Sequence, residues 1–370
     1  MSAGEHERGS AIRSGRATRE PMHGIGSSER PLAESAGRIG ARKTAKPGSN
    51  RLQFGWLRIA LLLVCAGASA SDLVLPKDGW VSWRVAAVEG ASDWCCFSGD
   101  HPGGRAPICD LDSRDSNYGG RDASPSITHM QLYARMRDGK VERVRAYGPD
   151  CPVKARGTIK DLGDVDADAS ARWLTGQLAG RKERFSDALA ALAIHAGSTA
   201  ENELARMAST PGEGERRMDA LFWLGHARGD AGVRRIEPLL TADPDPKVRQ
   251  HAAFAISQSN SARRGDLVLR QAQTDASEEV RSQAWFWLVQ SGDPRSEAEL
   301  RAALRSETSQ QVRHQAIFAL SQLPDDRGVA ALIDVIEDRQ LQIEERKQAL
   351  FWLGHSETEQ AIAYLDRVLR

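Results

Sequence analysis

Residues 312–320, Val312-Arg313-His314-Gln315-Ala316-Ile317-Phe318-Ala319-Leu320, decide the fold, because related stretches recur along the C-terminal half of the chain. Six copies align when the first alanine of each is superposed. These alanines are Ala188, Ala220, Ala252, Ala284, Ala316 and Ala349. Successive copies are 32 residues apart, except for the last, which follows after 33 residues. A fixed period of this length indicates a repeat architecture.

Each copy has the pattern of a helix pair. Four residues after each alanine comes an apolar residue, which lies on the same face of a helix with 3.6 residues per turn. These residues are Leu192, Leu224, Ile256, Leu288, Leu320 and Leu353. Breaks such as Asp293-Pro294 separate this helix from a second one, since proline opens a helix without losing a needed N–H group.

A lone helix pair cannot bury its apolar faces, so the copies must stack on one another. The sequence therefore predicts a mainly α fold, a right-handed α-solenoid of six helix-pair repeats over residues 166–370. The repeats are expected to begin near residues 183, 215, 247, 279, 311 and 344.

A different pattern precedes the repeats and predicts a small β-rich or α+β domain over residues 71–160. Residues 81–85 alternate apolar and polar side chains, as a half-buried strand does. Residues 127–147 predict a hairpin that turns at Asp138-Gly139, because a type I′ turn needs positive φ at both central residues. The expected facing pairs are Met136 with Val141, Tyr133 with Val144, and Met130 with Tyr147.

Four cysteines follow the first 70 residues, all within one stretch of 57 residues. They are Cys95, Cys96, Cys109 and Cys151. An even, clustered set in an exported chain predicts two disulfides in one small domain. A bond between adjacent cysteines would close a strained ring, so Cys95 and Cys96 are expected to pair outwards, in either order. The sequence disfavours a zinc site because no Cys-x-x-Cys occurs, and a redox-active adjacent pair is the alternative.

A polar stretch among these cysteines holds Asp110, Asp112, Asp115 and Asn117, whose oxygen atoms are of the type that binds Ca²⁺. An EF-hand-like loop would need an oxygen ligand at Arg114 and a glycine at Asp115. We therefore expect a solvated acidic loop and predict no metal site.

The first 70 residues predict a disordered leader followed by a signal peptide. Residues 1–50 are rich in Gly, Ser, Ala and Arg, which is typical of disordered segments. Two arginines then precede an apolar stretch at residues 59–66 and the small residues Ala68-Ser69-Ala70, which is the order found in a secretory signal. Cleavage near Ala70 would make the protein periplasmic or secreted. Signal peptides begin near the initiator methionine, so translation is expected to start near Leu52.

The distribution of charge narrows the classes of partner. The chain holds 50 Lys and Arg against 50 Asp and Glu, but residues 71–370 hold 39 basic and 45 acidic residues, a net charge of −6. A negative body disfavours sequence-independent binding of nucleic acid, in which neutralisation of phosphates supplies most of the affinity. No apolar run reaches the ~18–20 residues that span a bilayer, so no membrane span is predicted.

The repeated stretches resemble the HEAT-repeat superfamily, in the short form of phycobilin-lyase-like proteins. The likeness rests on residues 248–256, 280–288 and 312–320, which follow the pattern V-R-x-x-A-x-x-A-L, with Trp287 replacing the second alanine in one copy. The N-terminal part is similar to that of uncharacterised exported bacterial HEAT-repeat proteins. The resemblance implies binding of a protein partner as the default role, with no cofactor.

The resemblance transfers no catalytic residue. Deoxyhypusine hydroxylase, an enzyme of the superfamily, holds its di-iron centre with His-Glu pairs, and the single His-Glu pair of this chain, His6-Glu7, lies in the leader. Phycobilin lyases need a tetrapyrrole partner system to which nothing in the sequence points. No G-x-S-x-G, H-E-x-x-H or P-loop motif occurs, which favours a non-catalytic role.

Two further side chains recur on the face opposite the expected core. A phenylalanine follows most of the alanines by two residues, about 160–200° around the helix, and a neutral hydrogen-bonding residue follows four positions later. The candidates for partner binding are Phe222, Phe254, Phe286, Phe318, Phe351, His226, Gln258, Gln290, Gln322 and His355. In the competing interpretation each phenylalanine packs under its own second helix or a neighbouring one.

An arginine precedes five of the six alanines by three residues. These are Arg217, Arg249, Arg281, Arg313 and Arg346. Their guanidinium groups are expected to bridge successive turns and to cap carbonyl groups, which is a structural role. A row of anion-binding sites is the alternative.

These features together predict an exported, non-catalytic scaffold or adaptor that binds a protein partner through its repeat surface. The alternative is an envelope enzyme or redox protein with its chemistry around Cys95 and Cys96.

Overall fold

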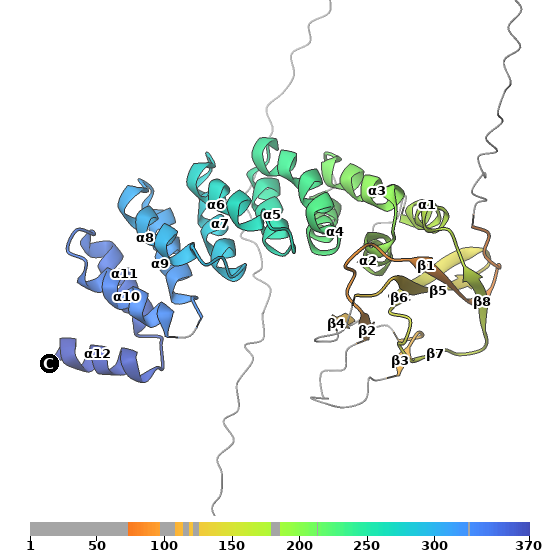
Figure 1. Cartoon of the computed structure of the whole chain (residues 1–370), viewed down its shortest axis with the longest axis horizontal. Coiled ribbons are helices and arrows are strands. Elements are labelled where there is room, and N and C mark those ends of the chain that lie inside the picture. Colours follow the sequence, from red (N-terminus) through yellow and green to blue (C-terminus); the bar gives the residue numbers. More distant parts are fainter. Residues whose placement is uncertain are drawn as a thin grey trace, which may run out of the picture. The chain divides into compact units, whose positions relative to one another are not determined.

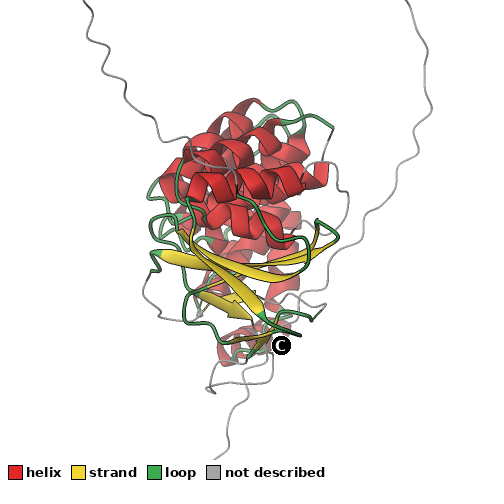
Figure 2. Cartoon of the chain, turned by 90° about the vertical axis from the view of Figure 1, so that its right-hand side faces the viewer, coloured by secondary structure: helices red, strands yellow, loops and turns green. Residues whose placement is uncertain are grey.

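The computed structural model describes residues 73–96, 108–113, 118–120, 126–178, 186–212, 214–324 and 326–370. The predicted leader and signal peptide lie outside the described residues, as do Asp115 and Asn117. In the described part the strands come first and the helices follow (Figure 1), and Figure 2 distinguishes the two kinds of element by colour. None of its helices is both long and apolar enough to cross a membrane.

The strands form one larger sheet and two small ones. They are β1 (Gly79–Ala86), β2 (Trp94–Cys96), β3 (Cys109–Asp110), β4 (Tyr118–Gly120), β5 (His129–Arg137), β6 (Lys140–Tyr147), β7 (Val153–Lys154) and β8 (Ile159–Asp164). The larger sheet has the order β6-β5-β1-β8, in which β1 is antiparallel to β5 and parallel to β8. Because β8 belongs to this sheet, the strand region extends past the expected limit at residue 160.

The predicted hairpin forms from β5 and β6. Its turn residues Asp138 and Gly139 have φ of 51° and 73°, as a type I′ turn requires. Met136 faces Val141 as predicted, but the register shifts after Arg135, and the other two predicted pairs are wrong. The observed pairs are Tyr133 with Arg145 and Gln131 with Tyr147. An irregularity of this kind shifts the pairing of β5 with β6 by one residue. The alternation of apolar and polar side chains in the sequence does not reveal where such a shift occurs.

The predicted helical array follows the sheet. The helices are α1 (Ala167–Leu178), α2 (Ser186–Ile194), α3 (Ser198–Ser209), α4 (Gly214–Ala242), α5 (Pro246–Ser257), α6 (Arg264–Thr274), α7 (Glu278–Gln290), α8 (Ser296–Ser306), α9 (Gln310–Ser321), α10 (Arg327–Glu337), α11 (Ile343–Leu353) and α12 (Glu359–Leu369). Gly229, with φ 48° and ψ −134°, divides α4 into two helices. Helices α2 to α12 of the described part therefore make six consecutive pairs (Figure 1).

Local sequence sets where the first helices of the pairs begin. The side chains of Ser277 and Ser309 accept hydrogen bonds from backbone N–H groups of α7 and α9, and Asp245 does the same for α5. Such caps satisfy donors that have no partner inside the helix. The first helices α4, α5, α7, α9 and α11 then pack on one another in order along the array.

The larger sheet and the helices share one hydrophobic core. The fully buried ring of Trp83 in β1 meets Trp173 of α1 edge-on, with 5.4 Å between ring centroids. The backbone also joins the two parts, because the Val88 N–H donates to the Ile194 carbonyl at 2.7 Å. The region of strands is therefore attached to the first repeat by packing as well as by the chain.

A buried histidine stands at this junction. His195 is fully buried, its Nδ1 donates to the Ala191 carbonyl at 2.7 Å, and its Nε2 accepts from the Ser170 hydroxyl at 2.8 Å. That hydroxyl oxygen accepts in turn from Nε1 of Trp83 at 2.8 Å. Burial, the main cause, and the nearby charge of Arg228 lower the pKa of His195 to about 4, although the hydrogen bond to Ala191 and the charge of Asp168 oppose them. The imidazole is thus neutral in the folded protein.

We expect His195 to make stability depend on pH. The unfolded chain takes up a proton near pH 6.5, whereas the folded one does so only near pH 4, so stability is fully present above 6.5 and is lost as the pH falls toward 4. Urea unfolding should show about 2 kcal/mol less contribution from this group at about pH 5 than at about pH 7. His195→Gln should lack this difference, and the exposed control His129→Gln should keep it.

Candidate functional site

The predicted row of phenylalanines lies on the first helices of repeats two to six. In each of these helices the alanine is fully buried, as Ala316 and Ala349 illustrate. Phe222, Phe254, Phe286 and Phe318 are half-buried, and Phe351 is 52% exposed. The five hydrogen-bonding candidates, His226, Gln258, Gln290, Gln322 and His355, are all exposed. The rings are therefore accessible along one side, and none of the five is packed away under a second helix.

The structure brings these rings together with tryptophans from alternate repeats. We call the set the aromatic ladder, and its members are Trp94, Phe222, Trp223, Phe254, Phe286, Trp287, Phe318, Phe351 and Trp352. Rings of successive repeats meet at centroid distances of 6.0 Å (Phe222–Phe254), 4.6 Å (Phe254–Trp287), 5.8 Å (Phe286–Phe318) and 4.8 Å (Phe318–Trp352). Within a repeat, neighbouring rings meet at 5.1 Å (Phe222–Trp223), 4.9 Å (Phe286–Trp287) and 5.1 Å (Phe351–Trp352). The ladder is thus continuous from ring to ring.

The alternation of Trp and Ala along the repeats follows from this packing. Each tryptophan of repeats four and six meets the phenylalanine of the repeat before it. At the intervening positions Ala255 and Ala319 are fully buried. The space at Ala255 is small, since a Cβ atom added to Gly225 would collide with the Ala255 carbonyl oxygen. A large ring in every repeat would not fit so close an approach.

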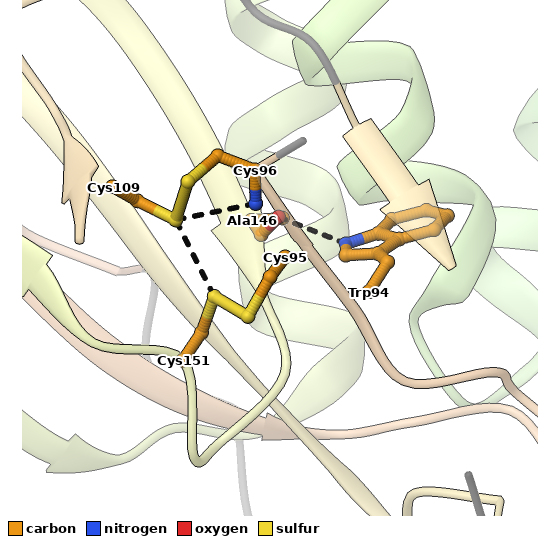
Figure 3. The surroundings of a disulfide bond; sticks show 6 residues. All are labelled: Trp94, Cys95, Cys96, Cys109, Ala146 and Cys151. Atoms are coloured by element: carbon orange, nitrogen blue, oxygen red, sulfur yellow. Dashed lines mark hydrogen bonds between the residues drawn. A yellow bond between two sulfur atoms is a disulfide. The ribbon is translucent and has the colours of Figure 1, made fainter. Parts of the chain in front are cut away.

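Trp94 of β2 is a member of the ladder that the sequence did not reveal. The first repeat has Ala190 where later repeats have phenylalanine. Trp94 instead contacts Trp223, with ring centroids 5.9 Å apart and planes at 70°. Its Nε1 donates to the Ala146 carbonyl at 2.9 Å, which fixes the indole (Figure 3). The missing phenylalanine of the first repeat was the available signal, but it does not say which residue fills the gap.

Two rows of polar side chains flank the ladder, and both are nearly free of charge. The first polar row comprises His226, Gln258, Gln290, Gln322 and His355, and the second comprises Asp219, His251, Gln283, Gln315 and Gln348. Residues three or four positions from each phenylalanine share its face of the helix. Desolvation lowers the pKa of His226, whose ring stacks on Phe222, and of His251. Charged residues make up 27% of the chain, but these ten positions include one carboxylate.

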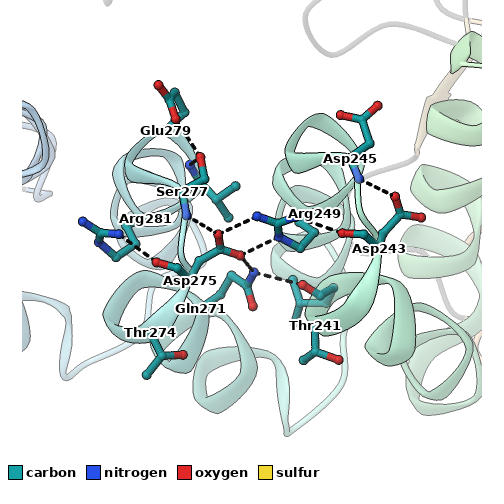
Figure 4. Close-up of polar contacts among 12 residues, drawn as sticks. Thr241, Asp243, Asp245, Arg249, Gln271, Thr274, Asp275, Ser277, Glu279 and Arg281 are labelled. Atoms are coloured by element: carbon teal, nitrogen blue, oxygen red, sulfur yellow. Dashed lines mark hydrogen bonds and ion pairs between the residues drawn. The ribbon is translucent and has the colours of Figure 1, made fainter.

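The five repeated arginines bind carboxylates and carbonyls of adjacent turns. Figure 4 shows two of them, Arg249 and Arg281. Arg249 donates to both carboxylate oxygens of Asp275 at 2.8 and 2.9 Å and to the Asp243 carbonyl at 2.9 Å. Arg281 repeats this pattern with Glu307 and the Asp275 carbonyl. Arg217 binds Asp243 and the Ala208 carbonyl, and Arg346 binds the Ile336 carbonyl. Arg313 binds Glu345 and the carbonyls of Glu307 and Thr308.

These contacts also determine whether the carboxylates beside the arginines are ionised. Burial raises the pKa of Asp275 and Glu307 and is the largest single effect on each. The hydrogen bonds and positive charges of Arg249 and Arg281, added to hydrogen bonds from backbone N–H groups, together outweigh burial and hold both pKa values below their usual range. Each of these guanidinium groups therefore faces an ionised carboxylate of its own protein. The geometry accounts for the arginines as links between repeats.

We expect Arg281→Ala to destabilise the fold. It leaves Glu307 and the Asp275 carbonyl without their donor, which should lower the free energy of unfolding by about 2–4 kcal/mol in urea titrations. Arg305→Ala is the matched control, because Arg305 also pairs with a carboxylate but is 56% exposed, and it should leave the unfolding midpoint nearly unchanged. An Arg281→Ala protein as stable as the parent that fails to bind its partner would instead support an anion site.

The four cysteines meet in one cluster beside Trp94 (Figure 3). Cys95 bonds to Cys151 and Cys96 bonds to Cys109, so both adjacent cysteines pair outwards. The two disulfides touch, because Sγ of Cys109 lies 3.5 Å from Sγ of Cys151. Three of the sulfurs lie within 4.8 Å of one another, but sulfurs held in disulfides are not the thiolates that bind metal ions.

The acidic residues near the cysteine cluster bind side chains and backbone groups of neighbouring strands and loops. Asp112 accepts from Nε1 of Trp80 at 3.2 Å and from the Arg156 backbone N–H at 2.5 Å. Asp110 lies 3.5 Å from the ammonium group of Lys154. These contacts tie the strand around Cys109 to its neighbours.

Comparison with known proteins agrees with the helix pairs. Residues 233–320 and 265–350 match the family of HEAT repeats. Among solved structures, human deoxyhypusine hydroxylase in complex with glycerol is similar at 15% identity, with 54% of this chain and 90% of that chain covered and a TM-score of 0.30. No curated protein sequence matches the chain significantly. Residues 233–350 of the helical array therefore carry HEAT repeats.

Proposed function

We propose that the protein is an exported, non-catalytic scaffold that binds a protein partner through the face of the aromatic ladder. The observation that carries the proposal is the continuous row of half-exposed rings on the first helices. Protein interfaces are enriched in aromatic side chains, and a few rings supply most of the binding energy. The ladder offers such rings repeatedly, between two rows of hydrogen-bonding groups.

The rigidity of the face supports the same function. The rings pack on one another at 4.6–6.0 Å. Beneath them, Arg249 and Arg281 join their first helices to carboxylates at the ends of the second helices α6 and α8. Side chains that are already ordered lose less conformational entropy when a partner binds. A surface built in this way favours tight recognition.

Export is supported by two independent features. The sequence order of residues 51–70 is that of a signal peptide, and the four remaining cysteines form two disulfides. Disulfides persist in the periplasm and outside the cell, whereas cytosolic thiols are kept reduced.

A photo-crosslinking residue tests the binding face directly. Placed at Gln290 or Gln322, which are exposed in the first polar row, it should give one defined adduct in cells that export the protein. Placed at the exposed Gln273 of α6, away from the ladder, it should give no such adduct. Equal labelling at Gln273, or none at the ladder, would contradict the proposal.

The proposed export predicts where the mature protein begins. The protein recovered from the cell envelope or the medium should begin at Ser71, as read by N-terminal sequencing and intact mass. Replacing Ala68 and Ala70 by bulky residues should block this cleavage, because the signal peptidase needs small side chains there. A chain that keeps residues 51–70 and stays in the cytosol would refute export.

A redox protein is the second candidate, favoured by the contact between the two disulfides. An external dithiol that reduces the Cys96–Cys109 bond would leave a thiolate on Cys109, 3.5 Å from Sγ of Cys151. Attack by this thiolate would form a Cys109–Cys151 bond, break the Cys95–Cys151 bond and release Cys95 as a thiolate. Thiol titration of the exported protein separates the candidates. Four cysteines that resist mild dithiol reductant indicate structural bonds, whereas two readily titrated thiols indicate a redox pair.

A further inference from the structure

One ring of the aromatic ladder is already in contact with a side chain from an extended segment of the same chain. Trp94 lies in strand β2, and its ring contacts Trp223 of the second repeat. In the same way Phe254 contacts Trp287 and Phe318 contacts Trp352, each one repeat further along. Trp94 is 8% exposed and meets Trp223 edge-on. The molecule therefore shows which chemistry fits the ladder, because an aromatic side chain from an extended strand packs there.

The orientation of the ladder rings also indicates which class of ligand fits them. Phe286 and Phe318 are stacked with 8° between their planes, and Phe222 and Phe254 with 15°, so the rings of each pair cover part of one another's faces. The edge of an aromatic ring carries partial positive charge and packs well against the face of another ring. A sugar, by contrast, stacks on an open ring face. The ladder thus favours an aromatic side chain over a saccharide.

The flanking rows favour a partner without charge. Nine of their ten side chains are amides or imidazoles, and desolvation keeps His226 and His251 neutral near neutral pH. An extended chain has backbone N–H and C=O groups along both sides that need partners. Glutamine amides both donate and accept, so they suit such a backbone.

We propose that the aromatic ladder binds an extended, uncharged polypeptide segment that carries aromatic side chains. These side chains pack on the ladder as Trp94 packs on Trp223. This rests on the proposed scaffold function and specifies the chemistry of its partner. The face continues an interface that the chain itself makes, from Trp94 through Phe351. Each aromatic side chain of the partner meets ladder rings, and its backbone meets the polar rows.

Calorimetric titration of the full chain with a capped peptide of sequence GSWGSWGSW tests the proposal. We expect binding that changes less than about twofold between about 0.05 M and about 0.5 M salt, because no ion pairs are involved. The same peptide with leucine at each tryptophan should bind at least about tenfold more weakly, since aromatic contacts carry the affinity. Lysine at those positions should abolish binding.

Variants of the protein locate the site. Phe351→Ala and Gln290→Ala change exposed side chains and should leave the melting temperature nearly unchanged while weakening the peptide several-fold or more. Ile362→Ala is the matched control, because Ile362 is 58% exposed on α12 but lies off the ladder, and it should bind as the parent does. Equal affinity in all three variants would overturn the proposal.

The remaining outcomes separate this inference from the scaffold function. Binding of a soluble linear glucan in preference to the peptide would overturn it in favour of a saccharide. Failure to bind either probe would also overturn it, while a defined crosslink at Gln290 would still uphold a protein-binding scaffold whose partner has different chemistry.

Discussion

A helix pair of this kind has too much apolar surface to stand alone, and that constraint shapes the molecule. Each repeat buries its alanine and leucine only when the next repeat covers them, as the fully buried Ala316 and Leu320 show. Close contact of the first helices follows, and with it the small residues at Gly225 and Ala255. The aromatic ladder is what this close contact produces on the outer side of the same helices.

Polar links fix the spacing that the apolar contacts allow. Arg249 and Arg281 each join their own helix to a carboxylate 26 residues further along the chain. Ion pairs buried to this extent add little net stability but are expensive to break, so they specify one arrangement of neighbouring repeats. The rings of the ladder are thereby held in register with the flanking glutamines.

Much of this architecture was predictable, because it repeats. The period of the alanines gave six helix pairs, and the Asp138-Gly139 turn gave the hairpin. Features that depend on contacts between distant segments were not predictable. The wheel position of Phe286 tells which way it points but not that Phe318 lies beside it, and the order of pairing of Cys95 and Cys96 depends on how the loops fold. The register slip after Arg135 belongs to the same class.

The place of Trp94 is the clearest case of a contact that no local pattern contains. The sequence shows a gap in the aromatic row at Ala190, but the residue that fills it stands almost a hundred positions earlier. The two come together because the sheet packs on α1 through Trp83 and Trp173. The strand region also bonds to the end of α2 in the first repeat, where the Val88 N–H donates to the Ile194 carbonyl.

The array differs in how firmly its two extremes are held. The first repeat packs against the sheet, where α2 contacts β6, whereas on α12 the side chains of Ile362 and Val368 are 58% and 50% exposed. In an array of nearest-neighbour contacts, local opening begins where fewest neighbours must separate. Amide hydrogen exchange will therefore form a gradient along the array, fastest in α12 and slowest beside the sheet. Local unfolding then starts at α12 and proceeds repeat by repeat toward the sheet.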